Sequence, residues 1–70
     1  ENDRIEFIVF EKDTLLLEEH LQKIREFFTG RKIMNGQEYW KVVFVDILEG
    51  AELNSGYYYS SIRFIFYKTT

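Results

Sequence analysis

The chain contains one histidine, His20, which could act as a general base near neutral pH. General-base catalysis requires a nucleophile or a substrate within hydrogen-bond reach. There is no cysteine, and Ser55, Ser60 and Ser61 lie outside any Gly-x-Ser-x-Gly elbow. His20 also lies at the edge of an apolar helical stripe. We therefore expect a half-buried structural histidine, no catalytic residues, and a protein that is not an enzyme.

Three carboxylates, Asp46, Glu49 and Glu52, recur at every third position. Carboxylate oxygens are the preferred protein ligands of Ca²⁺ and Mg²⁺. However, the Asp-x-Asp-x-Asp-Gly order of a calcium loop is absent, and the four glycines match neither of the Gly-rich phosphate-binding patterns. The carboxylates are better explained as part of a solvated loop, so we expect no metal site and no cofactor.

Aromatic side chains make up 19% of the chain and are its most suggestive feature. Aromatic rings stack on bases and basic side chains hold phosphates, so a sheet surface of both kinds could bind a single strand or a planar cofactor. Residues for such a ligand site are Trp40, Lys41, Tyr58 and Arg63. Aromatic residues also concentrate at protein interfaces. Residues for a partner or oligomer interface are Tyr39, Trp40, Tyr57, Tyr59, Ile65 and Tyr67.

Three segments with a period-two pattern and one short segment are predicted to be strands. Residues 4–10 are apolar on both faces, which predicts a strand covered on both sides and central in its sheet. Residues 37–48 form a strand with Trp40, Val42, Phe44 and Leu48 on one face, and Lys41 on the other. The Asn35-Gly36 pair predicts a hairpin between this strand and a short strand at 31–34.

The last strand is expected at residues 57–68. Its two faces are both rich in apolar and aromatic side chains. One face carries Tyr58, Ile62, Phe64 and Phe66, and the other carries Tyr57, Tyr59, Arg63, Ile65 and Tyr67. Since Lys41 has the opposite phase to Trp40, the two side chains are expected on different faces of their strand.

A helix is predicted at residues 14–29. Leu17, Leu21, Ile24 and Phe28 recur at spacings of four, three and four, which places them on one helical face. Asp13 or Thr14 can cap the first turn, and Gly30 can end the helix. The chain is thus predicted to form one α+β domain over residues 1–70, an antiparallel sheet of three or four strands with one helix on one face.

One helix can cover only one face of such a sheet. The other face would expose several aromatic and β-branched residues together, which soluble monomers seldom do. Self-association, most simply as a dimer, or binding to another protein would cover it. A net charge of −3 makes nucleic acid an unlikely partner. The longest apolar run has four residues, so we expect no membrane association and a cytoplasmic protein.

The order of a short strand, a helix and two long strands with Trp40 on the second resembles the topology of dodecins. These are small flavin-storing proteins that assemble as hollow dodecamers and stack flavin on that Trp. No Gly-Thr-Ser segment follows the first strand, and Asn35-Gly36 interrupts the place where their helix would run into the Trp strand. The resemblance implies a planar cofactor such as flavin against Trp40.

Two functional hypotheses follow. The favoured one is a non-enzymatic protein-interaction module that self-associates or binds another protein through a sheet face or edge. Small acidic chains without cysteine of this kind often act as regulators or inhibitors, including phage-encoded ones, so a viral regulator or inhibitor fits this hypothesis. The alternative is an aromatic sheet platform that binds single-stranded nucleic acid or a planar cofactor.

Overall fold

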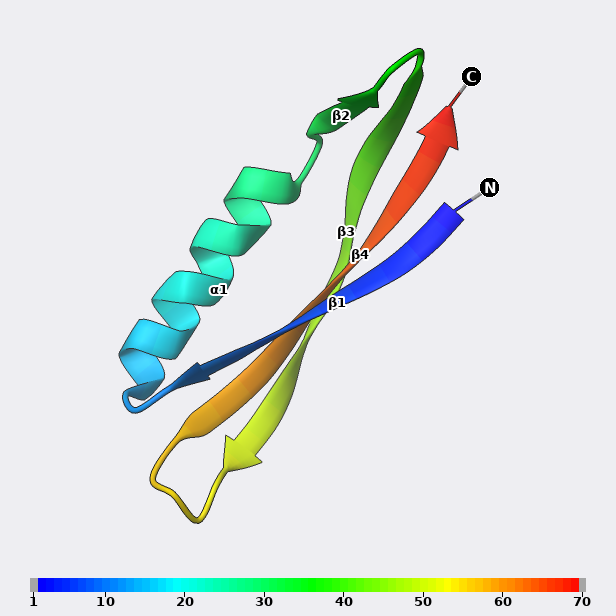
Figure 1. Ribbon diagram of the computed structural model, residues 1–70. Helices are drawn as coiled ribbons and strands as arrows, with labels where there is room; N and C mark the ends of the chain where they lie inside the picture. Colours follow the sequence, from blue (N-terminus) through cyan, green and yellow to red (C-terminus); the bar gives the residue numbers. More distant parts are fainter. Residues whose placement is uncertain (1, 70) are drawn as a thin grey trace.

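The computed structural model describes residues 2–69, which form one helix and four strands (Figure 1). The elements are β1 (Asn2–Glu11), α1 (Thr14–Phe28), β2 (Lys32–Asn35), β3 (Glu38–Glu52) and β4 (Tyr58–Thr69). The strands make one antiparallel sheet in the order β1-β4-β3-β2. The predicted single α+β domain with one helix on an antiparallel sheet is therefore confirmed.

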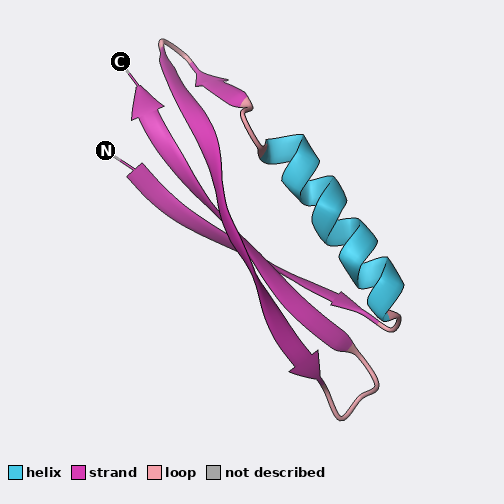
Figure 2. Cartoon of the chain, turned by 180° about the vertical axis from the view of Figure 1, so that it is seen from behind, coloured by secondary structure: helices cyan, strands magenta, loops and turns pink. Residues whose placement is uncertain are grey.

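The helix α1 lies along one face of a twisted sheet and covers only part of its length (Figures 1 and 2). Fifteen residues at about 1.5 Å each give a helix of about 22 Å, whereas the molecule is 45 Å long. The Asp13 carboxylate caps the helix by accepting the Leu15 N–H at 2.7 Å. Beyond Thr29 the chain turns at Gly30, whose φ of +74° favours glycine.

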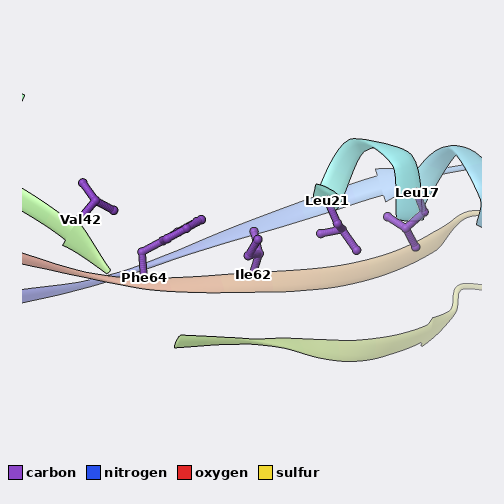
Figure 3. Close-up of a cluster of buried hydrophobic side chains, with 5 residues drawn as sticks. All are labelled: Leu17, Leu21, Val42, Ile62 and Phe64. Carbon is purple, nitrogen blue, oxygen red and sulfur yellow. The ribbon is translucent and has the colours of Figure 1, made fainter. Parts of the chain in front are cut away.

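The buried core lies between α1 and the sheet. Figure 3 shows Leu17 and Leu21 of α1 pointing toward the sheet, on which Ile62, Phe64 and Val42 lie. Phe7 and Phe28 extend this core, with ring centroids 5.2 Å apart in a stacked arrangement. Each of these residues falls on the face that the apolar spacing predicted, because burial of one stripe and one sheet face is what holds the elements together.

The prediction that the first strand is central is wrong, because β1 is an edge strand and β4 lies between β1 and β3. Phe7 and Val9 pack toward the core, whereas Ile8 and Phe10 on the other face are 54% and 52% exposed. Two apolar faces therefore indicate an exposed apolar surface here and not a central position.

A bulge in β3 changes the face on which its second half lies. Phe44 pairs with Phe64, but the next pair in the register is Asp46 with Arg63, so Val45 is an extra residue. As a result Ile47 lies opposite Ile62 on the helix side, and Leu48 lies on the other side. Strict alternation predicted the reverse for these two residues and is wrong beyond Phe44.

The hairpin before β3 is present, with Asn35 paired to Glu38. The two turn residues are Gly36 and Gln37, so Asn35 itself ends β2 instead of lying in the turn. Gly36 has φ of +66°, which satisfies the requirement of such turns for positive φ.

Candidate functional site

The candidate site is the sheet face opposite α1, which we call the open face. Within residues 2–69, α1 is the only element packed against the sheet, and it lies on the other side (Figure 2). The pairing register places side chains of β1, β4 and β3 in rows across the open face. From one end to the other, these rows are Lys41–Tyr67, Val43–Ile65–Arg4, Asp46–Arg63–Glu6, Leu48–Ser61–Ile8 and Tyr59–Phe10.

Apolar side chains occupy the open face on both sides of a central charged row. Val43 is exposed on one side of it, beside Ile65, and Val45 of the bulge is exposed nearby. On the other side, Leu48, Ile8 and Phe10 are each at least 41% exposed. These residues form two exposed apolar groups separated by the charged row, and exposed apolar groups on a domain of this size mark interaction sites.

The central row is held by an ion pair between Arg63 and Asp46. The guanidinium donates two hydrogen bonds to the carboxylate, with Nε–Oδ1 at 2.7 Å and Nη2–Oδ2 at 2.5 Å. This is the bidentate geometry in which charge-assisted bonds are strongest. The carboxylate of Glu6, opposite Arg63 in the register, contributes further negative charge. The row is therefore fixed in place and carries one net negative charge.

The hydrogen bonds from Arg63 hold the pKa of Asp46 below its ordinary value of 3.8. The positive charge of the guanidinium acts in the same direction, and partial burial opposes it. Hydrogen bonding to Asp46 correspondingly raises the pKa of Arg63, with the charges of Asp46 and Glu6 adding to the effect. A carboxyl whose pKa is lowered on folding stabilises the folded state above its ordinary pKa and loses that contribution as the pH falls.

We expect an acid titration of the Asp46 carboxyl carbon, followed by NMR, to give a midpoint below 3.8 in the folded protein. The stability difference between the native chain and Asp46→Asn should be full near neutral pH and should shrink as the pH falls below that ordinary value. Glu49→Gln, in the same strand, is the control. A midpoint at or above the ordinary value would mean that the ion pair does not form in solution.

At one end of the open face, the backbone oxygen and the ring of Tyr59 pack closely against Gly50. A Cβ at position 50 would collide with the Tyr59 backbone oxygen and would lie 2.6 and 2.7 Å from two carbons of the Tyr59 ring. The ring also lies 6.0 Å from that of Phe10. Gly50 falls within a second register irregularity of β3, between Glu49 and Glu52. The absence of a side chain at position 50 thus sets the position of Tyr59 on the open face.

Gly50→Ala should destabilise the fold by about 1–3 kcal/mol, the usual cost of overpacking, because the backbone of β4 cannot yield as a side chain can. Ala51→Ser at the neighbouring exposed position is the control and should change stability by less than about 0.5 kcal/mol. Urea denaturation of the two variants measures the difference. Equal stabilities would show that β3 and β4 are not in this close register.

The structure divides the six predicted interface residues among three places. Tyr39, Tyr59, Ile65 and Tyr67 belong to the open face by their pairing. Trp40 pairs with Ile33 and Lys68 and lies on the helix side of the sheet. Tyr57 precedes β4, in the loop, where the Lys12 amine lies 5.4 Å from its ring centroid.

The four residues of the alternative ligand site do not converge either. Trp40 and Tyr58 lie on the helix side, whereas Lys41 and Arg63 lie on the open face. Arg63 also forms an ion pair with Asp46. A single ligand cannot contact this set across the sheet.

The apolar residues of the open face that the sequence prediction of an interface omitted are Ile8, Phe10, Val43, Val45 and Leu48. Ile8 and Phe10 form the second apolar face of the first strand, and the sequence pattern predicts that this face is covered. Alternation of side chains along the strand predicts that Leu48 shares the face of Trp40. The bulge at Val45 reverses this, and the sequence pattern gives no sign of the bulge.

The remaining candidates for catalysis or metal binding are His20 and the carboxylates Asp46, Glu49 and Glu52. The His20 Nδ1 atom lies 2.8 Å from the Glu11 Oε2 atom, at the start of the α1 layer. Asp46 and Glu49 lie on opposite faces of β3 by their pairing. Among residues 2–69, no three His, Cys, Asp or Glu side chains are grouped so as to hold a metal ion. In the same residues, no helix has the length and apolar character needed to cross a membrane.

Comparison with protein-family models, with curated proteins and with solved structures gives no match for this chain.

Proposed function

We propose that the protein is a non-enzymatic interaction module that pairs with a second copy of itself through the open face. The observation that carries the proposal is the exposure of apolar side chains on both sides of the charged row of the open face, namely Val43, Val45, Leu48, Ile8 and Phe10. Burying this surface releases its hydration water, which is the main driving force of association. In this proposal the module acts in the cytoplasm as a small regulator or inhibitor and needs no cofactor.

The dimensions of the molecule suit a stable pair. The molecule is 45 Å long and 18 Å wide, so one of its faces can offer at most about 800 Å², which is about the area that each partner buries in an interface of standard size. Smaller contacts are common in crystals but seldom hold copies together in solution. Most of the open face would therefore have to take part, including the charged row at its centre.

The arrangement of the open face is compatible with a second copy. In a two-fold pair the same patch meets itself, and an axis near the Asp46–Arg63–Glu6 row would place the apolar groups on either side of it against each other. The Arg63–Asp46 pair is already neutralised within each chain, which lowers the cost of burying it. The remaining carboxylate, Glu6, lies opposite Arg63 of its own chain.

Sedimentation equilibrium tests this proposal directly. At micromolar concentration the chain should have at least twice its monomer mass of 8.5 kDa. Because the interface is mainly apolar, the association should weaken little when salt is raised, since screening acts on exposed charges. A monomer mass over the whole micromolar range would contradict self-association.

A further inference from the structure

A second feature lies on the helix side of the sheet, in the part that α1 does not cover. A hollow of about 410 Å³ is lined there by residues of all four strands, and we call it the Trp40 hollow. Its lining includes Asp3, Ile5, Ile33, Asn35, Trp40 and Phe66. β1 and β2 are the two edges of the sheet, so the sheet must curl for both edges to border the same hollow. The volume falls in the range of small-molecule sites.

The floor of the Trp40 hollow is aromatic and comes from the two central strands. Trp40 of β3 and Phe66 of β4 are each half-buried and leave part of their rings accessible. Ile5 on one side and Ile33 on the other add apolar walls. Planar molecules gain most from such a surface, because stacking uses the whole face of the ring.

Two polar side chains border the hollow from opposite edges of the sheet. Asp3 belongs to β1 and Asn35 to β2. Within residues 2–69, Asp3 takes part in no ion pair and in no side-chain hydrogen bond. The nearest basic residue by register, Lys68, lies 2.9 Å from Glu38 and is neutralised by it. The charge at the hollow is therefore negative.

We propose that the Trp40 hollow binds a small planar aromatic molecule that carries a cationic amino group. The ring lies on the floor of Trp40 and Phe66, the amino group donates hydrogen bonds to the Asp3 carboxylate, and the Asn35 amide bonds to a polar atom of the ring. This site is separate from the proposed dimer interface, because the two lie on opposite sides of the sheet.

Two probes with the same ring and opposite charge test the proposal, namely tryptamine and indole-3-propionate. Since Trp40 is the only tryptophan, its indole N–H gives a single NMR signal that reports on the hollow. Tryptamine should shift this signal and the side-chain amide signals of Asn35. It should bind about three- to fivefold more tightly than indole-3-propionate, as one exposed charge pair contributes.

Variants separate the contributions of charge and stacking. Asp3→Asn should abolish the preference for tryptamine, whereas Glu52→Gln, an exposed control at the far end of β3 from Trp40, should preserve it. Trp40→Leu should abolish binding of both probes, and circular dichroism shows whether the fold is intact. Equal affinities of the two probes for the native chain would overturn the proposal. Shifts confined to residues outside the hollow, or no shift of the Trp40 signal at millimolar tryptamine, would overturn it too.

Discussion

Replacing Phe64 by alanine should destabilise the folded state by about 3–5 kcal/mol, the range for removing a large aromatic side chain from a core. Phe64 is fully buried at the centre of the sheet. Its ring contacts those of Phe7, Phe28 and Phe44 at centroid distances of 5.5–6.0 Å. No neighbour can fill the resulting cavity without breaking these contacts. Relaxation of the structure should therefore recover little of the lost stability.

Phe27→Ala is the matched control, because Phe27 belongs to α1 but is 54% exposed. Its ring packs mainly on Phe28 and beneath the Arg31 guanidinium, so its loss should cost well under half as much. Chemical denaturation of both variants gives the two free energies of unfolding. Comparable losses at the two positions would mean that the core does not lie between α1 and β4.

Leu48→Glu should convert the proposed dimer into a monomer without unfolding the chain. Leu48 is 41% exposed on the open face, so a polar side chain can remain solvated in the monomer. In a dimer the new carboxylate would be buried against an apolar surface, close to Asp46 and Glu6, and burial of an unpaired charge is strongly unfavourable.

Leu15→Glu is the matched control for this variant. It makes the same chemical change at a side chain that is 74% exposed, in the first turn of α1 and away from the open face. A carboxylate in that turn also interacts favourably with the helix dipole. Light scattering should give a monomer for Leu48→Glu and a dimer for Leu15→Glu. Dissociation of both, or of neither, would exclude the open face as the interface.

The elements were predictable from the sequence because their apolar residues follow simple periods. The spacing of Leu17, Leu21 and Phe28 predicts one buried helical face, and the structure buries that face. The capping residue Asp13 was one of two candidates, and its carboxylate accepts the Leu15 N–H. These features are local, so the residues that determine them lie within a few positions of each other.

Strand order and strand faces depend on residues that are distant in sequence and were less predictable. β1 has two apolar faces whether it is central and covered or at an edge with one face exposed to solvent. The bulge at Val45 reverses the faces of Ile47 and Leu48, although the local pattern continues to alternate. The predicted interface residues included Trp40, which lies on the helix side, and omitted Ile8, Phe10, Val43, Val45 and Leu48.

The most direct test of the open face as a self-association surface is an isotope-filtered NOE experiment on a mixture of labelled and unlabelled chains, which detects only contacts between copies. We expect intermolecular NOEs among the side chains of Ile8, Val43, Leu48 and Ile65, with none to the exposed Leu15 of α1. Intermolecular NOEs that involve α1 and omit these four residues, or a complete absence of intermolecular NOEs at millimolar concentration, would contradict it.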